Sequence, residues 1–68
     1  MTDWQDRLFQ EYKELGGKII KLETFLNSYF PSPEEEPTIA LMEIQYNVMK
    51  AYHNILYLRI KNFMKGDD

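Results

Sequence analysis

Cysteine is absent from this 68-residue chain, and histidine occurs once, as His53. The lack of cysteine excludes disulfides and thiolate metal sites. The single histidine excludes a metal site built from several histidines. No apolar run approaches the ~18 residues of a membrane span, and the first residues lack a signal-peptide pattern. We therefore expect a cytoplasmic protein with no bound metal and no membrane partner.

Apolar residues are abundant by contrast, at 44% of the chain, and ten residues are aromatic. This composition is too apolar for a disordered tail. A chain this short still leaves much of its surface uncovered and usually needs a disulfide, a metal or a second chain for stability. Because the chain has no cysteine and only one histidine, association with another chain is the remaining source of stability. The composition predicts one domain over residues 1–68 that forms a homo-oligomer.

Charge is unevenly distributed along the chain, although the formal net charge is only −3. Residues 34–36 are three consecutive glutamates, and there is no carboxylate between Glu43 and Asp67. That stretch carries the positive charges of Lys50, Arg59 and Lys61. A net negative chain with an acidic turn opposes the approach of a polyanion, so we expect no nucleic-acid partner.

A first helix is predicted over about residues 3–29. Thr2 and Gln5 resemble a capping box that starts it, and Pro31 ends it because the residue before a proline avoids the α region. Its apolar residues recur every three or four positions, which is close to a heptad repeat. They are Trp4, Leu8, Tyr12, Leu15, Ile19, Leu22, Leu26 and Tyr29.

A second helix is predicted over about residues 38–65, after a turn at about 30–37. Pro37 is tolerated in a first helical turn, and Gly66 is suited to closing the last one. Two long helices with a short connection indicate an antiparallel hairpin. We therefore predict an all-α fold, a two-helix hairpin that assembles into a homo-oligomeric helical bundle.

The second helix is apolar over a wide arc. One stripe contains Leu41, Ile44, Val48, Ala51, Ile55 and Leu58, and a neighbouring one contains Met42, Gln45, Met49, Tyr52, Leu56, Arg59 and Phe63. At 100° per residue the combined arc spans roughly 200°, against the ~100° that a single packing partner covers. One partner helix cannot cover this arc, so we expect a dimer or a larger assembly.

Two polar residues within that arc have alternative interpretations. Arg59 is expected level with the segment from Leu8 to Glu11, so it either pairs with Glu11 and fixes the register or holds a ligand anion between hairpins. Gln45 is either an interface amide that sets the register or an amide that recognises the edge of a base.

Gly16 and Gly17 occupy the middle of the first helix, where each costs roughly 1 kcal/mol relative to alanine. The pair either ends the helix or lets another backbone or a ligand approach closely. Because the stripe keeps its phase between Leu15 and Ile19, we favour a continuous helix with a close approach. The space beside Gly16 makes Tyr12 the best candidate for stacking on a planar ligand.

Catalysis is not expected. Ser28 and Ser32 lie at the turn, far along the helix from His53, so there is no arrangement of nucleophile and base. Gly16-Gly17 follows no strand and is no phosphate loop. His53 has no companion for a metal and is expected on the flank of the second helix. We therefore predict a non-enzyme without a cofactor.

Three runs of residues resemble a known family. The first helix contains Arg7-x3-Glu11-Tyr12-x-Glu14-Leu15 and Lys21-Leu22-Glu23-x-Phe25-Leu26, and the second contains Leu41-x3-Gln45-x3-Met49-x2-Tyr52-x2-Ile55-Leu56-x2-Arg59. These runs resemble small phage-encoded helical-hairpin proteins, which are similar to the hairpin domain of viral nucleotide sponges that counter CBASS and Thoeris immunity. The resemblance implies an oligomer that sequesters cyclic nucleotides without destroying them.

In such sponges an aromatic side chain stacks on the base and a lysine or arginine meets the phosphate. The resemblance implies that Tyr12 takes the first role and that Lys18, Lys21 or Arg59 takes the second. The full set of predicted ligand-binding residues is Tyr12, Gly16, Lys18, Lys21, Gln45, Tyr52 and Arg59.

Two functions follow as hypotheses. The first is a phage anti-defence sponge, acting in the host cytoplasm, that holds a cyclic oligonucleotide or a cyclic ADP-ribose-type signal in pockets between subunits. The alternative is a small coiled-coil adaptor that binds another protein through its wide apolar face. The adaptor predicts that Arg59→Ala affects stability alone, whereas the sponge predicts a substitution that abolishes ligand binding and leaves the oligomer intact.

Overall fold

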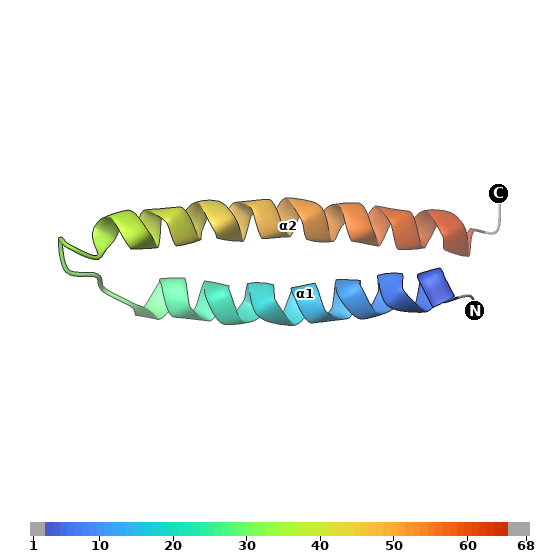
Figure 1. Cartoon of the computed structure of the whole chain (residues 1–68), viewed down its shortest axis with the longest axis horizontal. Helices are drawn as coiled ribbons and strands as arrows, with labels where there is room; N and C mark the ends of the chain where they lie inside the picture. The colour runs from blue at the N-terminus through green and yellow to red at the C-terminus, as the bar shows by residue number, and fades with distance from the viewer. Residues whose placement is uncertain (1–2, 66–68) are drawn as a thin grey trace.

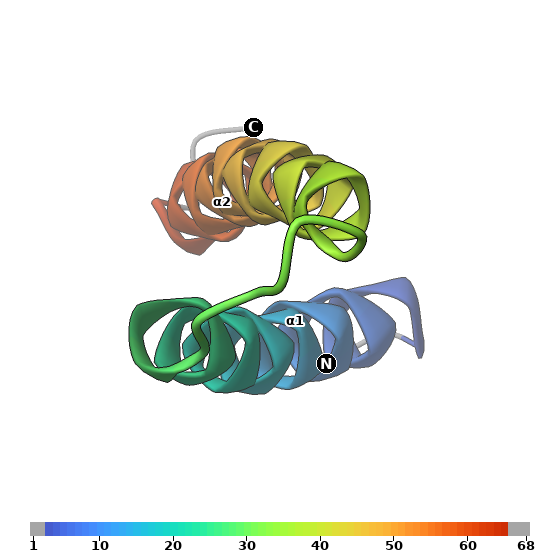
Figure 2. The same ribbon diagram turned by 90° about the vertical axis from the view of Figure 1, so that its left-hand side faces the viewer.

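The computed structural model describes residues 3–65, which form two antiparallel helices packed against each other (Figure 1). Helix α1 spans Asp3–Ser28 and helix α2 spans Glu36–Met64. They form a rod 52 Å long and 16 by 15 Å across. Figure 2 shows the two helices as two layers joined by the connecting segment. The predicted all-α hairpin is confirmed, and each helix begins and ends within two residues of its expected position.

Helix α1 runs without a break through both glycines, as the unbroken phase of its apolar stripe predicts. Asp3 and Asp6 lie in its first turn, where negative charge complements the helix dipole. The expected capping residue Thr2 lies outside the described residues, and so does Gly66 at the far end of α2. Within residues 3–65, no helix combines the length and the hydrophobicity that crossing a membrane requires.

The connection between the helices is built around Glu35. The backbone N–H and the hydroxyl of Ser32 both donate to Glu35 Oε1, at 3.0 and 3.1 Å, and Tyr29 Oη donates to Glu35 Oε2 at 2.5 Å. The Glu35 N–H in turn donates to the Ser32 carbonyl at 2.9 Å. Pro37 follows in the first turn of α2, where its missing N–H removes no helical bond. These bonds tie the end of α1 to the start of α2.

The same hydrogen bonds shift the ionisation of both partners. The bond from Tyr29, followed by the bonds from Ser32, lowers the pKa of Glu35 below its ordinary value of 4.5. Accepting that bond, Glu35 raises the pKa of Tyr29 above 10.0. The charged carboxylate and the neutral phenol are therefore the forms that the turn favours.

A stripe of side chains from each helix fills the interface at heptad spacing. Leu56 is fully buried, and Leu8, Ile60 and Ile19 are nearly so. The inward residues that continue this stripe along α1 are Leu8, Tyr12, Leu15, Ile19, Leu22 and Leu26, and Tyr29 follows just after the helix. The inward residues of α2, called here the inner stripe, are Ile39, Met42, Tyr46, Met49, His53, Leu56, Ile60 and Phe63.

Aromatic rings close the end of the hairpin where α1 begins and α2 ends. Phe63 meets Trp4 and Phe9 edge to face, each with ring centroids 5.5 Å apart. Phe9 was not predicted to be part of the stripe but is half-buried against the core. Trp4, expected on the stripe, is 48% exposed and covers only the edge of this cluster.

The inner stripe corrects the expected orientation of α2. Gln45, Tyr52 and Arg59, expected within the apolar arc, are all exposed in the hairpin. Gln45 follows Met42 by three residues, a rotation that turns it about 60° away from α1. Tyr52 follows Met49 by three residues, and Arg59 follows Leu56 by three residues, so both are turned away from α1 by the same angle. The arc therefore belongs partly to the interface with α1 and partly to the outside of the hairpin.

Candidate ligand-binding cleft

An open cleft of about 450 Å³ lies along one side of the hairpin, where α1 carries its glycines. Helix α1 contributes Tyr12, Gly16, Ile19 and Ile20, and α2 contributes Lys50, His53, Asn54 and Tyr57. Among the described residues, the eight that line this cleft include one lysine and no carboxylate. The cleft therefore combines aromatic rings, apolar walls, an amide and a positive charge.

Gly16 shapes the floor of the cleft by letting the His53 ring pack close to the backbone of α1. A Cβ added at Gly16 would lie 3.1 Å from His53 Nε2, tighter than ordinary contacts. A Cβ added at Gly17 would meet nothing within 4 Å. The group that approaches Gly16 is therefore a side chain, the His53 ring, and not the backbone or ligand that was expected, and no group approaches Gly17.

The rings of Tyr12 and His53 stack, with centroids 4.2 Å apart and planes 9° apart. Tyr57 lies beside them, its centroid 6.4 Å from that of Tyr12 and its plane tilted by 33°. His53 was expected on the flank of α2, but it is half-buried on the inner stripe. The stack fixes both rings against the helices and leaves Tyr57, 45% exposed, as the more accessible aromatic face.

Lys50 provides the positive charge at one end of the cleft. Its Nζ lies 4.5 Å from the centroid of the Tyr46 ring, within the range of a cation–π contact. Asn54 lies one turn further along α2 and brings both a donor and an acceptor. A long flexible lysine beside an amide and aromatic rings can neutralise a phosphate while the other groups contact a base.

Sequence reasoning identified Tyr12 and Gly16 but missed Lys50, His53, Asn54 and Tyr57 as parts of one site. A usable signal was present in the register of the hairpin. Leu8 and Ile60 pack in one core, so a glycine eight residues after Leu8 lies near the residue seven before Ile60, which is His53. An aromatic ring on one helix that lies level with a glycine on the other helix predicts that the ring packs close to the glycine backbone.

Tyr52 and Lys18 lie together in a separate, smaller hollow. It measures about 130 Å³ and is lined by Glu11, Glu14, Leu15, Lys18 and Tyr52. Tyr52 Oη donates a hydrogen bond to Glu11 Oε2, and this bond raises the pKa of Tyr52 above 10.0. The positive charge of Arg59 acts in the opposite direction. This hollow has two carboxylates, so a phosphate is disfavoured there.

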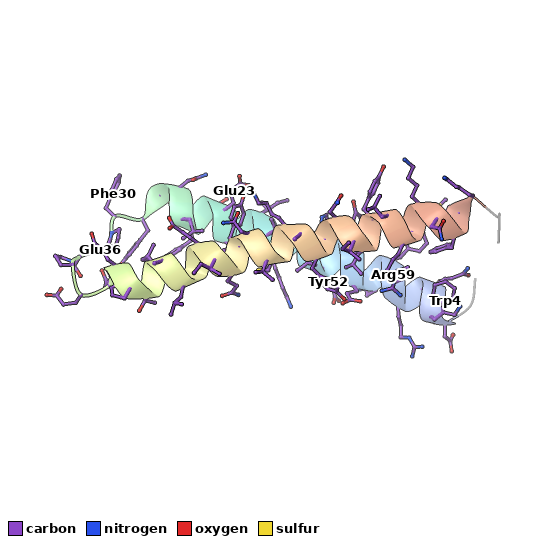
Figure 3. The ribbon with its side chains drawn as sticks, turned by 90° about the horizontal axis from the view of Figure 1, so that it is seen from above. Trp4, Glu23, Phe30, Glu36, Tyr52 and Arg59 are labelled. Carbon is purple, nitrogen blue, oxygen red and sulfur yellow. The ribbon has the colours of Figure 1, made fainter. Side chains whose placement is uncertain are left out.

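Arg59 is exposed rather than buried, and in the part of the chain that the structure describes the partner of Glu11 is Tyr52, not Arg59. Figure 3 shows Tyr52 and Arg59 along the same edge of α2. Arg59 needs no buried counter-charge in the single hairpin because water solvates it. Gln45 and Lys21 are exposed too and do not line the cleft around Gly16.

Metal-binding residues do not gather in the described part of the chain: residues 3–65 contain no group of three or more histidine, cysteine, aspartate or glutamate side chains that could hold an ion. The cleft accordingly offers its rings, its amide and its lysine as binding groups. Groups of these kinds can recognise a planar anionic molecule.

Comparison with known proteins places this hairpin in a family. The model of the family described as Sequestin matches residues 2–62, which is most of the chain. No curated protein and no solved structure matches it. The match agrees with the resemblance to sponge-like hairpin proteins that the sequence indicated. The chain belongs to the Sequestin family, whose name indicates a protein that sequesters a molecule rather than an enzyme.

Proposed function

We propose that this protein is a phage sponge that binds a cyclic nucleotide immune signal and holds it without altering it. The signal is a cyclic oligonucleotide or a molecule of the cyclic ADP-ribose type, and its removal from solution inhibits the host defence that it activates. The protein acts in the host cytoplasm as a homo-oligomer, with pockets between subunits. The family name supports sequestration as the general activity.

The cleft beside Gly16 is the observation that carries this proposal. Tyr57 and the Tyr12–His53 stack offer aromatic surface to a base, Asn54 can bind its edge, and Lys50 can neutralise a phosphate. These are the three kinds of group that a cyclic nucleotide requires. Tyr12 and Gly16, two of the predicted ligand residues, belong to this cleft.

The size and openness of the cleft support a pocket that is shared between subunits. Its volume of about 450 Å³ is within the range of small-molecule sites, roughly 300–1,000 Å³. It is open to solvent on the outside of the hairpin, whose two helices form two layers (Figure 2). Gln45, Tyr52 and Arg59 do not line this cleft, so a ligand bound in it meets them only if they come from another hairpin.

Calorimetry with purified protein tests binding directly. The panel contains cyclic dinucleotides, a cyclic trinucleotide and cyclic ADP-ribose, and we expect saturable heat from at least one of them. The bound nucleotide should be recovered unchanged after the protein is denatured, as chromatography would show. No heat with any member overturns the proposal, and recovery of a cleaved nucleotide indicates an enzyme instead of a sponge.

A pair of lysine variants connects binding to the cleft. Lys50→Gln should weaken binding by about 10-fold or more, because a charged hydrogen bond contributes roughly 1.5–3 kcal/mol. Lys13→Gln is the matched control: Lys13 is an exposed lysine that does not line the cleft and is not among the predicted ligand-binding residues. Equal losses in both variants would mean that binding depends on overall charge and not on this site.

The exposed apolar face of α2 favours an adaptor as the second candidate function. Ile44, Val48 and Ile55 are 60%, 61% and 50% exposed, which suits a partner helix from another protein. An adaptor gives no heat with the nucleotide panel, and its Lys50→Gln variant keeps full partner binding. The sponge loses its ligand in that variant while its oligomer survives.

A further inference from the structure

A second heptad stripe runs along the outside of α2 and has no partner in the hairpin. We call it the outer seam: Leu41, Ile44, Val48, Ala51, Ile55 and Leu58. Its residues are spaced three, four, three, four and three apart, which is the pattern of a coiled-coil seam. All six are exposed, and the five larger side chains range from 48% at Leu58 to 68% at Leu41.

The outer seam lies on the side of α2 away from α1. With 100° per residue, its mean direction is about 150° from that of the inner stripe. Residues 3–65 contain no third helix or strand that could reach it. A continuous aliphatic strip of this length in water is costly and marks an interface.

We propose that a second copy of this chain covers the outer seam, with the two α2 helices packed antiparallel about a two-fold axis between Met49 and Lys50. The inference specifies the interface of the oligomer in the proposed function, and it rests on that function only in taking the protein to act as an oligomer. Its support comes from register, charge and shape.

One antiparallel register pairs every residue of the outer seam with another. Leu41 lies level with Leu58 of the second copy, Ile44 with Ile55, and Val48 with Ala51. A shift by one heptad in either direction leaves two residues of the seam without a seam partner: one shift sets Leu41 and Ile44 against Lys65 and Asn62, and the other sets Ile55 and Leu58 against Pro37 and Glu34. The favoured register also overlaps the two α2 helices along their whole length, because Glu36 and Phe63 lie at the same level.

The positions that flank the outer seam are uncharged near the axis. Gln45 comes beside Tyr52 of the second copy, and Asn47 comes beside Asn54. Side chains of these types can hydrogen-bond across the two edges. In this arrangement Gln45 is an amide at the interface, which is one of the two roles that the sequence predicted for it.

Charge selects the antiparallel direction. At the two ends of the pair, the basic residues Arg59, Lys61 and Lys65 of one copy approach the glutamates at 34–36 of the other. A parallel pair would instead gather both acidic turns at one end and both basic ends at the other. Like charges brought together across an interface oppose association, so the unequal charge distribution favours the antiparallel pair.

The shape of the surface at one end of the outer seam also fits a second copy. A hollow of about 540 Å³ lies there, lined by Ile55, Leu58, Arg59, Lys61, Asn62 and Lys65. In the proposed register the side chain of Leu41 from the second copy lies at the level of Leu58 and fills the apolar part of this hollow. Such insertion of a side chain between those of the facing helix is the packing of coiled coils.

The second copy also contributes to the cleft. Asn54 lines the cleft and flanks the outer seam, and the register brings Asn47 of the second copy beside it. The dimer therefore adds an amide to the rim of each cleft. A ligand can in this way contact two subunits, as the proposed function requires.

Disulfide trapping tests this register, since the natural chain has no cysteine to interfere. Ile44→Cys and Ile55→Cys are prepared as separate proteins, without nucleotide, and are oxidised singly and as a mixture. The mixture should give a disulfide dimer, because those two residues lie level. Each protein alone should give none, because identical residues lie eleven positions apart along the axis, about 16 Å.

Lys13→Cys mixed with Thr24→Cys is the matched control, with the same spacing on exposed positions of α1. Trapping in the mixture of Ile44→Cys and Ile55→Cys, above this control, supports the proposal. Dimers from either seam variant alone indicate a parallel pair and overturn it, as does trapping no greater than the control. A monomeric mass for the natural chain at micromolar concentration also overturns it. Nucleotide binding is measured separately by calorimetry. A negative result for disulfide trapping therefore does not decide the proposed function, and a negative result for nucleotide binding does not decide the interface.

Discussion

The two faces of α2 carry the same spacing and have different environments. On the inner stripe Leu56 is fully buried and Ile60 is 8% exposed, whereas on the outer seam Leu58 and Leu41 are 48% and 68% exposed. A helix with one partner needs one apolar face. The second face of α2 is therefore best explained by a second partner.

The two faces also differ in chemistry. The inner stripe includes the rings of Tyr46, His53 and Phe63, which pack against particular features of α1 such as Gly16. The outer seam is aliphatic throughout. Irregular aromatic packing specifies one match between two unlike helices, whereas a regular aliphatic seam suits pairing with an identical one. The difference indicates that α1 is the internal partner of α2 and a second copy the external one.

Truncating one leucine on each face gives the largest expected contrast. Leu56→Ala should lower the free energy of unfolding by about 2–5 kcal/mol, because it leaves a cavity in the only fully buried position of the described chain. Measured on the dissociated hairpin, at a protein concentration too low for the dimer, Leu58→Ala should cost clearly less, since this side chain is 48% exposed when α2 has no outer partner. Urea unfolding measures both, and equal losses would contradict the distinction between the faces.

A charge placed on the outer seam should separate assembly from folding. Ile44→Lys should convert the oligomer to a folded monomer, because two lysines would be buried in the symmetric interface. Ile20→Lys is the control on α1, where the isoleucine is 63% exposed against 60% for Ile44. Sedimentation gives the mass and circular dichroism the helix content. An unchanged mass in Ile44→Lys would remove the outer seam as the interface.

The sequence predicted the elements well because their signals are local. The stripe from Leu8 to Tyr29 and the prolines around the turn determine where α1 and α2 begin and end. The side of α2 that faces α1 could not be predicted in the same way, since both its faces repeat at three and four residues. That choice depends on contacts between the helices, where the His53 ring lies against Gly16 and where Leu56 and Ile60 share a core with Leu8.

The cleft was predictable only in part. Gly16 stands out as a helix interruption, and it led to Tyr12 as its neighbour one turn away. His53 was judged by its chemistry, as a lone histidine without a companion, although its level in the hairpin brings it against Gly16. Lys50 and Asn54 carry no local signal, because exposed lysines and asparagines are common on any helix.

The two adjacent glycines allow the inner and outer sides of α1 to be compared directly. Gly17→Ala should stabilise the hairpin by about 0.5–1 kcal/mol, because alanine favours the helix and its Cβ meets nothing within 4 Å. Gly16→Ala should gain less, since its Cβ displaces the His53 ring. Thermal unfolding measures both. A larger gain at Gly16 would show that the close approach to His53 has no cost.

Gly16→Ala should also weaken nucleotide binding relative to Gly17→Ala. The added methyl group lies at the floor of the cleft and shifts the stacked rings of His53 and Tyr12. The same calorimetric panel gives the result. Equal affinity in the two variants would mean that the ligand does not enter beside Gly16.

The smallest expected effect concerns the ionisation of the turn, where α2 begins and neither face is buried. Tyr29→Phe removes the leading cause of the lowered pKa of Glu35, so that pKa should rise toward its ordinary value of 4.5 and stay somewhat below it because both Ser32 bonds remain. The contribution of Glu35 to stability is present above that ordinary pKa and is lost as the pH falls through the lower folded value.

The raised pKa of Tyr29 has the opposite dependence. Its contribution is present below 10.0 and is lost as the pH rises through the raised folded value. Carbon-13 NMR titration of the Glu35 carboxyl group measures the first shift, with Tyr57→Phe as a control because Tyr57 lies in the cleft away from the turn. An unchanged Glu35 pKa in Tyr29→Phe would mean that the Ser32 bonds alone hold the carboxylate.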